Sequence, residues 1–337
     1  MTTHTHSRSG GRGQPCPITL AFNAAKLAGR GEDADPLLRI SKEGAAILGV
    51  FDGLGGSGAQ RCGGTDGVQT GAYYGARVAR QATDDFLKIA TQFADVTPAA
   101  LAAVLVQHLQ HDLSAYDAEW GRAASSALRS TVFRRLPTTA AVAVARPAAG
   151  ELRTTVLWAG DSRCYALSPA YGLQQLTRDH LRTFSDALGN LTTDSSISNC
   201  ITADAPFTID SAECSIAAPV ILIAATDGCF GYVPSPMHFE ALLVASLVSA
   251  RSVSAWHAGL AARVTAVAGD DASLAAIAIG WSSFRTLRRA FADRLRILQQ
   301  TYLDPFVAAP ETLPALWLAY RATYEALQPK ELACVTT

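Results

Sequence analysis

The sequence has little of what marks secreted, membrane-spanning or nucleic-acid-binding proteins. Its seven cysteines are an odd number and include no C-x-x-C pair, so neither a disulfide framework nor a cysteine zinc site is expected. No apolar run reaches the ~18 residues that a membrane span needs, and residues 1–13 contain no apolar signal segment. Charged residues make up only 17% of the chain, and the net charge of −1 gives no attraction for nucleic acid or an acidic membrane.

Apolar sequence, by contrast, is abundant. It makes up 49% of the 337 residues, which excludes a disordered chain and allows one large domain, alone or with an appendage. The absence of a signal segment and of a membrane span, together with the scarce charge, predicts a cytoplasmic protein that binds neither nucleic acid nor membrane.

Three acidic motifs stand next to stretches rich in aliphatic residues. They are F-D-G-L-G-G at residues 51–56, A-T-D-G at 225–228 and D-D-A-S-L at 270–274. A glycine follows Asp52 and Asp227 directly, which places both carboxylates at strand ends. Carboxylates at the ends of separate buried strands repel one another and lose solvation, and a hard polyvalent cation is the usual compensation. The pattern therefore predicts a metal-dependent hydrolase.

The hydrophobic pattern predicts alternating groups of strands and paired helices. Strands are expected at 45–51, 139–145, 152–159, 163–167, 173–176, 220–225 and 272–281, and helices at about 68–89, 98–128, 237–250 and 254–268. Short spacings between the middle strands favour antiparallel hairpins. This order predicts an α+β sandwich with two sheets inside and helices outside. Residues 183–215 are rich in Ser, Thr, Asn and Asp and are expected to form an irregular surface insertion that acts as a flap.

The character of the chain changes beyond residue 282. Apolar residues recur at helical spacing with arginines between them, and a second helical stretch follows the prolines at 305–314. We therefore expect a disordered terminus at 1–14, a main domain at 15–281 and a helical extension at 282–337. The extension either packs against its own domain or presents a face for a partner or a second copy.

Six short motifs, in order over residues 18–281, resemble those of the metal-dependent serine/threonine protein phosphatases of type 2C. They are G-E-D-A at 31–34, V-F-D-G-L-G-G at 50–56, W-A-G-D-S-R at 158–163, L-T-R-D-H at 176–180, A-A-T-D-G at 224–228 and D-D-A-S-L at 270–274. The resemblance implies a four-layer αββα sandwich, here with the added C-terminal helical extension. The hydrophobic residue after D-G in the second motif is similar to that of bacterial members.

The resemblance also implies a site for two Mg²⁺ or Mn²⁺ ions. Asp52 would bridge both ions, and Asp227 and Asp270 would complete the coordination of one of them. Glu32 and the backbone carbonyl of Gly53 would serve the other. Metals of this kind prefer oxygen ligands, whereas Zn²⁺ would require His or Cys, which this set of implied ligands does not include.

Further residues are implied to support this site. Asp161, in the G-D-S-R turn, would hold a third ion together with Asp227. Asp33 and Asp271 would stabilise the ligands, and the choice between Asp270 and Asp271 as the ligand stays open. His180 is expected to hold the turn by a hydrogen bond rather than to take part in the reaction.

The implied activity is hydrolysis of phosphoserine and phosphothreonine in proteins by a water activated between the ions. The expected partner is a phosphorylated protein, with a serine/threonine kinase as one candidate. Two alternatives remain open: a catalytically weak or inactive module that binds a phosphoprotein through the helical extension, and a phosphatase of small molecules.

Two positions depart from the family pattern. Leu54 stands where many members have a His that helps to protonate the leaving group, so another group must supply that proton. Ala28 occupies the position of the family's phosphate-binding Arg. Lys26 and Arg30 flank it, and Arg30 is our candidate for the missing contact.

Overall fold

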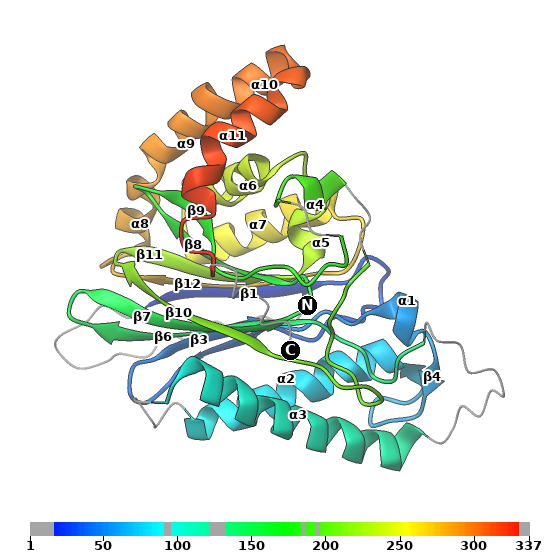
Figure 1. The fold of residues 1–337 in the computed structure, drawn as a ribbon. Coiled ribbons are helices and arrows are strands. Elements are labelled where there is room, and N and C mark those ends of the chain that lie inside the picture. Colours follow the sequence, from blue (N-terminus) through cyan, green and yellow to red (C-terminus); the bar gives the residue numbers. More distant parts are fainter. Residues whose placement is uncertain (1–16, 91–95, 122–132, 184–185, 193–195, 330–337) are drawn as a thin grey trace, which may run out of the picture.

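The chain folds as a four-layer sandwich of two stacked β-sheets between two layers of helices, as the sequence predicts (Figure 1). The computed structural model describes residues 17–90, 96–121, 133–183, 186–192 and 196–329. The terminus predicted to be disordered therefore lies outside the described residues. None of the described helices is both long and apolar enough to cross a membrane.

Each sheet has five strands, paired antiparallel throughout, in the orders β1-β12-β11-β8-β9 and β10-β7-β6-β3-β2. The first sheet contains β1 (Ile18–Ala24), β8 (Arg163–Ser168), β9 (Gly172–Gln175), β11 (Val220–Ala225) and β12 (Ala272–Ile279). The second contains β2 (Leu37–Ile40), β3 (Ala46–Val50), β6 (Ala140–Ala148), β7 (Glu151–Ala159) and β10 (Asp210–Ala217). A small hairpin is formed by β4 (Arg61–Cys62) and β5 (Gln69–Thr70). Four connections, β1–β2, β7–β8, β9–β10 and β10–β11, pass from one sheet to the other.

The central strands are apolar along their whole length because both of their faces are buried. In β11, Ile221 and Ile223 belong to the cluster under the outer helices, whereas Leu222 and Ala224 belong to the cluster between the sheets. This alternation follows from the two-residue period of a strand. Because both faces are buried, these strands are continuous apolar runs in the sequence, and such runs predicted them correctly.

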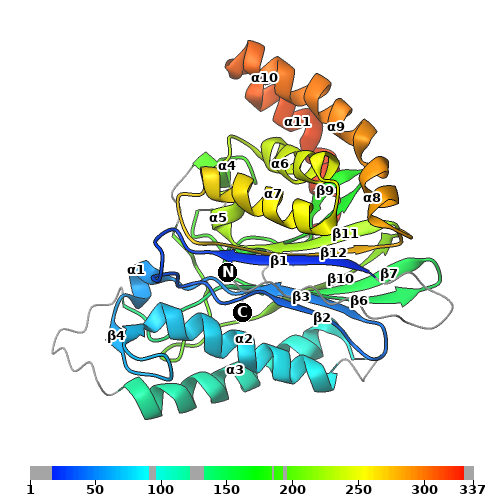
Figure 2. The same ribbon diagram turned by 180° about the vertical axis from the view of Figure 1, so that it is seen from behind.

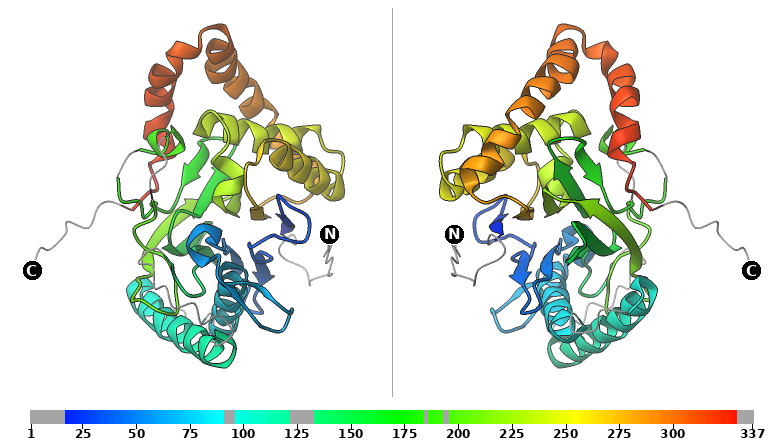
Figure 3. Two further views of the ribbon diagram at one scale, coloured as in Figure 1. Left: turned by 90° about the vertical axis from the view of Figure 1, so that its right-hand side faces the viewer. Right: turned by 90° about the vertical axis from the view of Figure 1, so that its left-hand side faces the viewer.

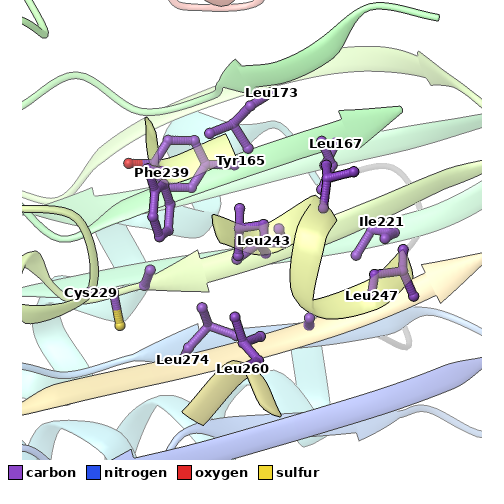
Figure 4. Close-up of a cluster of buried hydrophobic side chains, with 14 of the residues drawn as sticks. Tyr165, Leu167, Leu173, Ile221, Cys229, Phe239, Leu243, Leu247, Leu260 and Leu274 are labelled. Carbon is purple, nitrogen blue, oxygen red and sulfur yellow. The ribbon is translucent and has the colours of Figure 1, made fainter. Parts of the chain in front are cut away.

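Pairs of helices cover the outer faces of both sheets (Figures 1 and 2). The second sheet is covered by α2 (Gly71–Ala90) and α3 (Pro98–Trp120), and the first by α6 (Pro236–Ser249) and α7 (Val253–Val267). Figure 4 shows the core on the first sheet, where Phe239 and Leu243 of α6 lie against Tyr165 and Leu274 of the strands. The side-chain hydroxyl of Thr97 caps α3 by accepting a hydrogen bond from the N–H of Ala100 at 3.3 Å.

The C-terminal extension is helical and packs against the main body, while its far end projects away from the sandwich (Figure 3). It comprises α8 (Phe284–Ala290), α9 (Ala292–Leu298), a π-helical turn (Gln299–Leu303), α10 (Asp304–Ala308), a 3₁₀ turn (Pro310–Thr312) and α11 (Leu313–Tyr324). Glu240 of α6, with a fully buried side chain, accepts two hydrogen bonds from Arg294 at 2.6 and 2.8 Å and one from the Tyr320 hydroxyl at 2.5 Å. A buried charge that is satisfied in this way fixes the extension to the body.

The structure corrects three details of the sequence-based prediction. The part of the predicted irregular insertion from residue 210 onward is the edge strand β10, which pairs only with β7 and alternates polar and apolar residues. Strands β1 and β2 have partly exposed faces and were also missed. The first helix of the extension is interrupted at Phe291 and again at the π-helical turn.

Candidate active site

Asp52 follows β3 and lies in a loop held by hydrogen bonds from the second sheet. Its backbone carbonyl accepts hydrogen bonds from the N–H of Thr139 at 2.9 Å and from the Thr138 hydroxyl at 2.7 Å. Both donors immediately precede β6, the strand that pairs with β3. A short helix, α1 (Gly55–Gly58), follows at the same end of the sandwich as α5 (Asp227–Phe230) (Figures 1 and 2).

Asp227 is the first residue of α5, directly after β11, and its loop touches the loop before β12. A Cβ atom on Gly228 would lie 1.9 Å from the backbone oxygen of Asp271, so only glycine allows this approach. The backbone N–H of Thr226 donates to the carbonyl of Ser273 at 3.0 Å. Neighbouring strands of the first sheet thus bring two of the three acidic motifs together.

Asp271 holds the loop that carries Glu32. One oxygen of its carboxylate accepts from the backbone N–H of Lys26 at 2.8 Å, and the other from the N–H of Glu32 at 2.6 Å. Its neighbour Asp270 is exposed. The Asp271 carboxylate is therefore committed to backbone donors, as expected for a supporting residue.

Glu32 and Asp33 lie in the β1–β2 connection, where the chain crosses between the sheets. The Glu32 carboxylate accepts a hydrogen bond from the Thr70 hydroxyl at 2.5 Å. It also lies against Gly55, because a Cβ atom there would be 1.9 Å from Glu32 Oε2. Asp33 is buried and accepts from the Thr226 hydroxyl at 3.1 Å.

Asp161 lies in the β7–β8 turn, the second crossing between the sheets. Gly160 precedes it with a φ of 96°, a value that favours glycine. The N–H of Gly160 donates to Nδ1 of His180 at 3.1 Å, and the backbone N–H of His180 donates to the Gly160 carbonyl at 3.0 Å. The expectation that His180 holds this turn is confirmed.

Arg163, two residues after Asp161, forms a buried bidentate ion pair with Asp179. The two hydrogen bonds measure 2.9 and 2.6 Å, and both side chains are only 3% exposed. The guanidinium also lies 4.3 Å above the ring centre of Phe230, at the end of α5. One arginine thus connects the Asp161 turn, the L-T-R-D-H segment and the helix that begins at Asp227.

Burial, together with mutual repulsion, raises the pKa values of the carboxylates at this edge. Burial, followed by repulsion from Asp33, Asp227 and Asp161, raises the pKa of Asp52 well above its usual value. Burial and the Asp227 charge raise the pKa of Asp161 to about 8. Burial, then Asp270, raises the pKa of Asp227. Acidic groups from both sheets therefore share one region of low solvation.

The chemistry of this region suits a hard cation. Asp33 Oδ1 and Asp161 Oδ1 are buried without a hydrogen-bond partner, which a metal or its water shell would satisfy. Within the described ranges, however, no three His, Cys, Asp or Glu side chains are grouped closely enough to hold an ion as they stand. The donor set consists of oxygen atoms, which suits a hard divalent cation such as Mg²⁺ or Mn²⁺.

Of the other residues considered in the sequence, Gly53 is buried beside Glu32, whereas Arg30 and Lys26 lie in an exposed turn. Gly53 is buried and its backbone bridges to Thr138; a Cβ atom there would lie 2.7 Å from the Glu32 carbonyl. Arg30 lies in an exposed turn, where its N–H donates to the Leu27 carbonyl at 3.0 Å. Lys26 Nζ bonds to the carbonyl of Gly269 and is thereby directed to the neighbouring loop.

Sequence reasoning missed Thr70, Thr226 and Tyr232. The two threonines donate to Glu32 and Asp33, whereas the Tyr232 ring packs over Gly269. Burial, then Asp227 and Asp270, raises the pKa of Tyr232. Hydroxyl residues near an acidic motif are too common in sequences to be singled out, and only the fold identifies these three.

Comparisons with known proteins agree with the motifs and the fold. The family model for protein phosphatase 2C matches residues 32–277. The fold is similar to that of a bacterial serine phosphatase (TM-score 0.57, 15% identity, covering 80% of this chain and 100% of that one). It is also similar to PstP/Ppp of Mycobacterium tuberculosis (0.55, 14%, 79% and 99%) and Stp1 of Staphylococcus aureus (0.56, 14%, 81% and 100%). One structure of the PstP catalytic domain contains two manganese ions (TM-score 0.52). No curated protein matches in sequence.

Proposed function

Because this chain belongs to the protein phosphatase 2C family, we propose that it hydrolyses phosphoserine and phosphothreonine in proteins with the help of Mg²⁺ or Mn²⁺. The observation that carries the proposal is the cluster of mutually repelling carboxylates at the edge between the sheets. Divalent cations bound there would activate a water nucleophile and stabilise the charge on the phosphoryl oxygens.

The residues of the chain have distinct tasks in this proposal. Asp52 from the second sheet would hold the cations together with Asp227 and Asp270 from the first, and Glu32 and the Gly53 carbonyl would supply further oxygen ligands. Asp161 extends the cluster toward the β7–β8 turn. The exposed Arg30 is our candidate for binding the substrate phosphate, because it lies two residues before Glu32.

Protonation of the leaving group falls to solvent in this proposal. Leu54 provides no proton, since it contributes only its backbone N–H, which donates to the Pro137 carbonyl at 3.2 Å. A positioned acid typically contributes ~10²–10⁴-fold to a rate, so we expect slower turnover than in members that have a His at this position.

Hydrolysis of p-nitrophenyl phosphate with Mn²⁺ tests the activity and the assignments together. Asp52→Asn and Asp227→Asn are each expected to reduce kcat/KM by about 10²-fold or more, because metal-assisted charge stabilisation contributes several kcal/mol. Asp293→Asn is the matched control, since it removes an exposed carboxylate on α9. Full activity in both site variants would refute the ligand assignments.

The two departures from the family pattern favour one alternative, a phosphoprotein-binding module with weak or no activity. Ala28 lacks the guanidinium that holds the substrate phosphate in the family, Leu54 lacks the acid that protonates the leaving group, and the helical extension would supply the face that binds the partner. Wild-type protein that binds a phosphothreonine peptide but hydrolyses neither the peptide nor p-nitrophenyl phosphate would establish this alternative. Turnover of small phosphate esters without turnover of phosphopeptides would instead indicate a small-molecule phosphatase.

A further inference from the structure

Helix α11 of the extension is joined to the start of the 183–215 insertion through Asp186. The indole N–H of Trp317 and the Nη1 of Arg321 both donate to Asp186 Oδ2 at 3.0 Å. The other carboxylate oxygen accepts from the backbone N–H of Gly189 at 2.9 Å, at the start of the short helix α4 (Gly189–Thr192). Asp186 therefore connects the extension to the first turn of the insertion.

The later part of the same insertion reaches the Asp52 loop. Ile201 and Thr138 exchange two backbone hydrogen bonds of 2.9 Å, and the Thr138 hydroxyl donates to the Asp52 carbonyl. The N–H of Ser198 also donates to the carbonyl of His180 at 2.8 Å, beside the Asp161 turn. The described parts of the insertion thus contact α11 at Asp186, and the Asp52 loop and His180 at residues 198–201.

α11 is itself held firmly on the body of the protein. Tyr320 bonds to the buried Glu240, and the Thr323 carbonyl accepts from Gln174 Nε2 of β9 at 3.2 Å. Tyr324 is 1% exposed and lies 6.3 Å, between ring centres, from Tyr165 of β8. A helix anchored in this way can restrain a less regular segment that is bonded to it.

We propose that α11 acts as a latch that fixes residues 186–192 and 196–201 of the insertion beside the active site, and that the Asp186–Trp317–Arg321 cluster thereby determines how well phosphorylated proteins are bound. This role rests on the proposed phosphatase function. A small phosphate ester needs only the carboxylate site, whereas a phosphorylated segment of a protein must also fit the surface around it. The three residues are positioning residues, and they touch neither the metal ligands nor the reacting phosphate.

Asp186→Asn and Trp317→Phe test the latch. Asp186→Asn weakens the hydrogen bonds to α11 and keeps the size of the side chain, and Trp317→Phe removes the indole N–H donor but keeps a smaller aromatic ring. Asp293→Asn on α9 is again the matched control. We expect KM for phosphorylated casein to rise about threefold to tenfold in both variants, the change expected from losing a hydrogen bond. kcat/KM for p-nitrophenyl phosphate is expected to stay within about twofold of the wild-type value.

Hydrogen exchange gives a readout that does not depend on activity. In Asp186→Asn, amides at 186–192 and 196–201 are expected to exchange faster, while those of α6 keep their wild-type rates. Unchanged exchange in the insertion would overturn the latch. Equal losses on casein and p-nitrophenyl phosphate would overturn the role in specificity. A wild-type protein inactive on both substrates would overturn the proposed function and the specificity role with it, whatever the exchange shows.

Discussion

At the scale of single residues, close contacts between loops decide where the acidic groups lie. The sequence identified Asp52 and Asp227 because each ends an apolar run and precedes glycine. It could not decide between Asp270 and Asp271, which differ only in position. The structure shows that Asp271 binds two backbone N–H groups whereas Asp270 is exposed. That distinction depends on hydrogen bonds to Lys26 and Glu32, about 240 residues away in sequence. A local sequence pattern cannot reveal contacts over such a separation.

Gly228→Ala tests the contact between the Asp227 turn and the Asp271 loop. The added Cβ would lie 1.9 Å from the Asp271 carbonyl oxygen, so backbone must move. We expect a loss of about 1–3 kcal/mol in the free energy of unfolding, measured by urea denaturation, and lower phosphatase activity because Asp227 moves with the turn.

Gly56→Ala is the control for this substitution, since a Cβ there would meet nothing within 4 Å. Gly56 lies in α1, where alanine is about 1 kcal/mol more favourable than glycine, so this variant should be as stable as the wild type or more so. Equal stability of the two variants would contradict the close packing at Gly228.

At the scale of secondary-structure elements, burial explains which predictions succeeded. β3, β11 and β12 are buried on both faces, and their apolar runs made them visible in the sequence. β10 was missed because it is an edge strand that pairs on one side only. The interruption at Phe291 was missed because the helical spacing of apolar residues continues through it.

α10 meets the main body at His238 of α6, and this contact should depend on pH. The His238 ring packs edge-on against Phe306 with ring centres 4.8 Å apart, and its Nδ1 lies 2.7 Å from the Ser235 hydroxyl. Burial lowers the pKa of His238 below its usual value of 6.5. As pH falls below about 6.5, the unfolded chain takes up a proton before the folded protein does, so stability declines.

His238→Gln removes this proton uptake. We expect the wild type to lose more unfolding free energy than His238→Gln between about pH 7 and pH 5 in urea denaturation curves. His111→Gln on α3 removes an exposed histidine and should retain the wild-type slope. A slope in His238→Gln as steep as in the wild type would show that other groups cause the acid sensitivity.

At the scale of the whole molecule, stacking the two sheets is what assembles the site. Asp52 comes from the second sheet, and Asp227 and Asp270 from the first. Glu32 and Asp161 lie in two of the connections that cross between the sheets. Each contribution is separated from the others by long stretches of sequence. The order of the six motifs was enough to predict the fold. The supporting hydroxyl groups and the latch on the insertion, however, could be found only in the folded structure.

This assembly places repelling carboxylates at one edge, so a bound cation should stabilise the folded protein as a whole. Mn²⁺ that binds only the native state adds about 2.7 kcal/mol at a hundredfold excess over its Kd. We expect calorimetric unfolding to move to higher temperature when Mn²⁺ replaces EDTA. The shift should be largely lost in Asp52→Asn and kept in Asp293→Asn. Equal stabilisation of Asp52→Asn would mean that the ion binds elsewhere, and the shared edge of the two sheets would then not be a metal site.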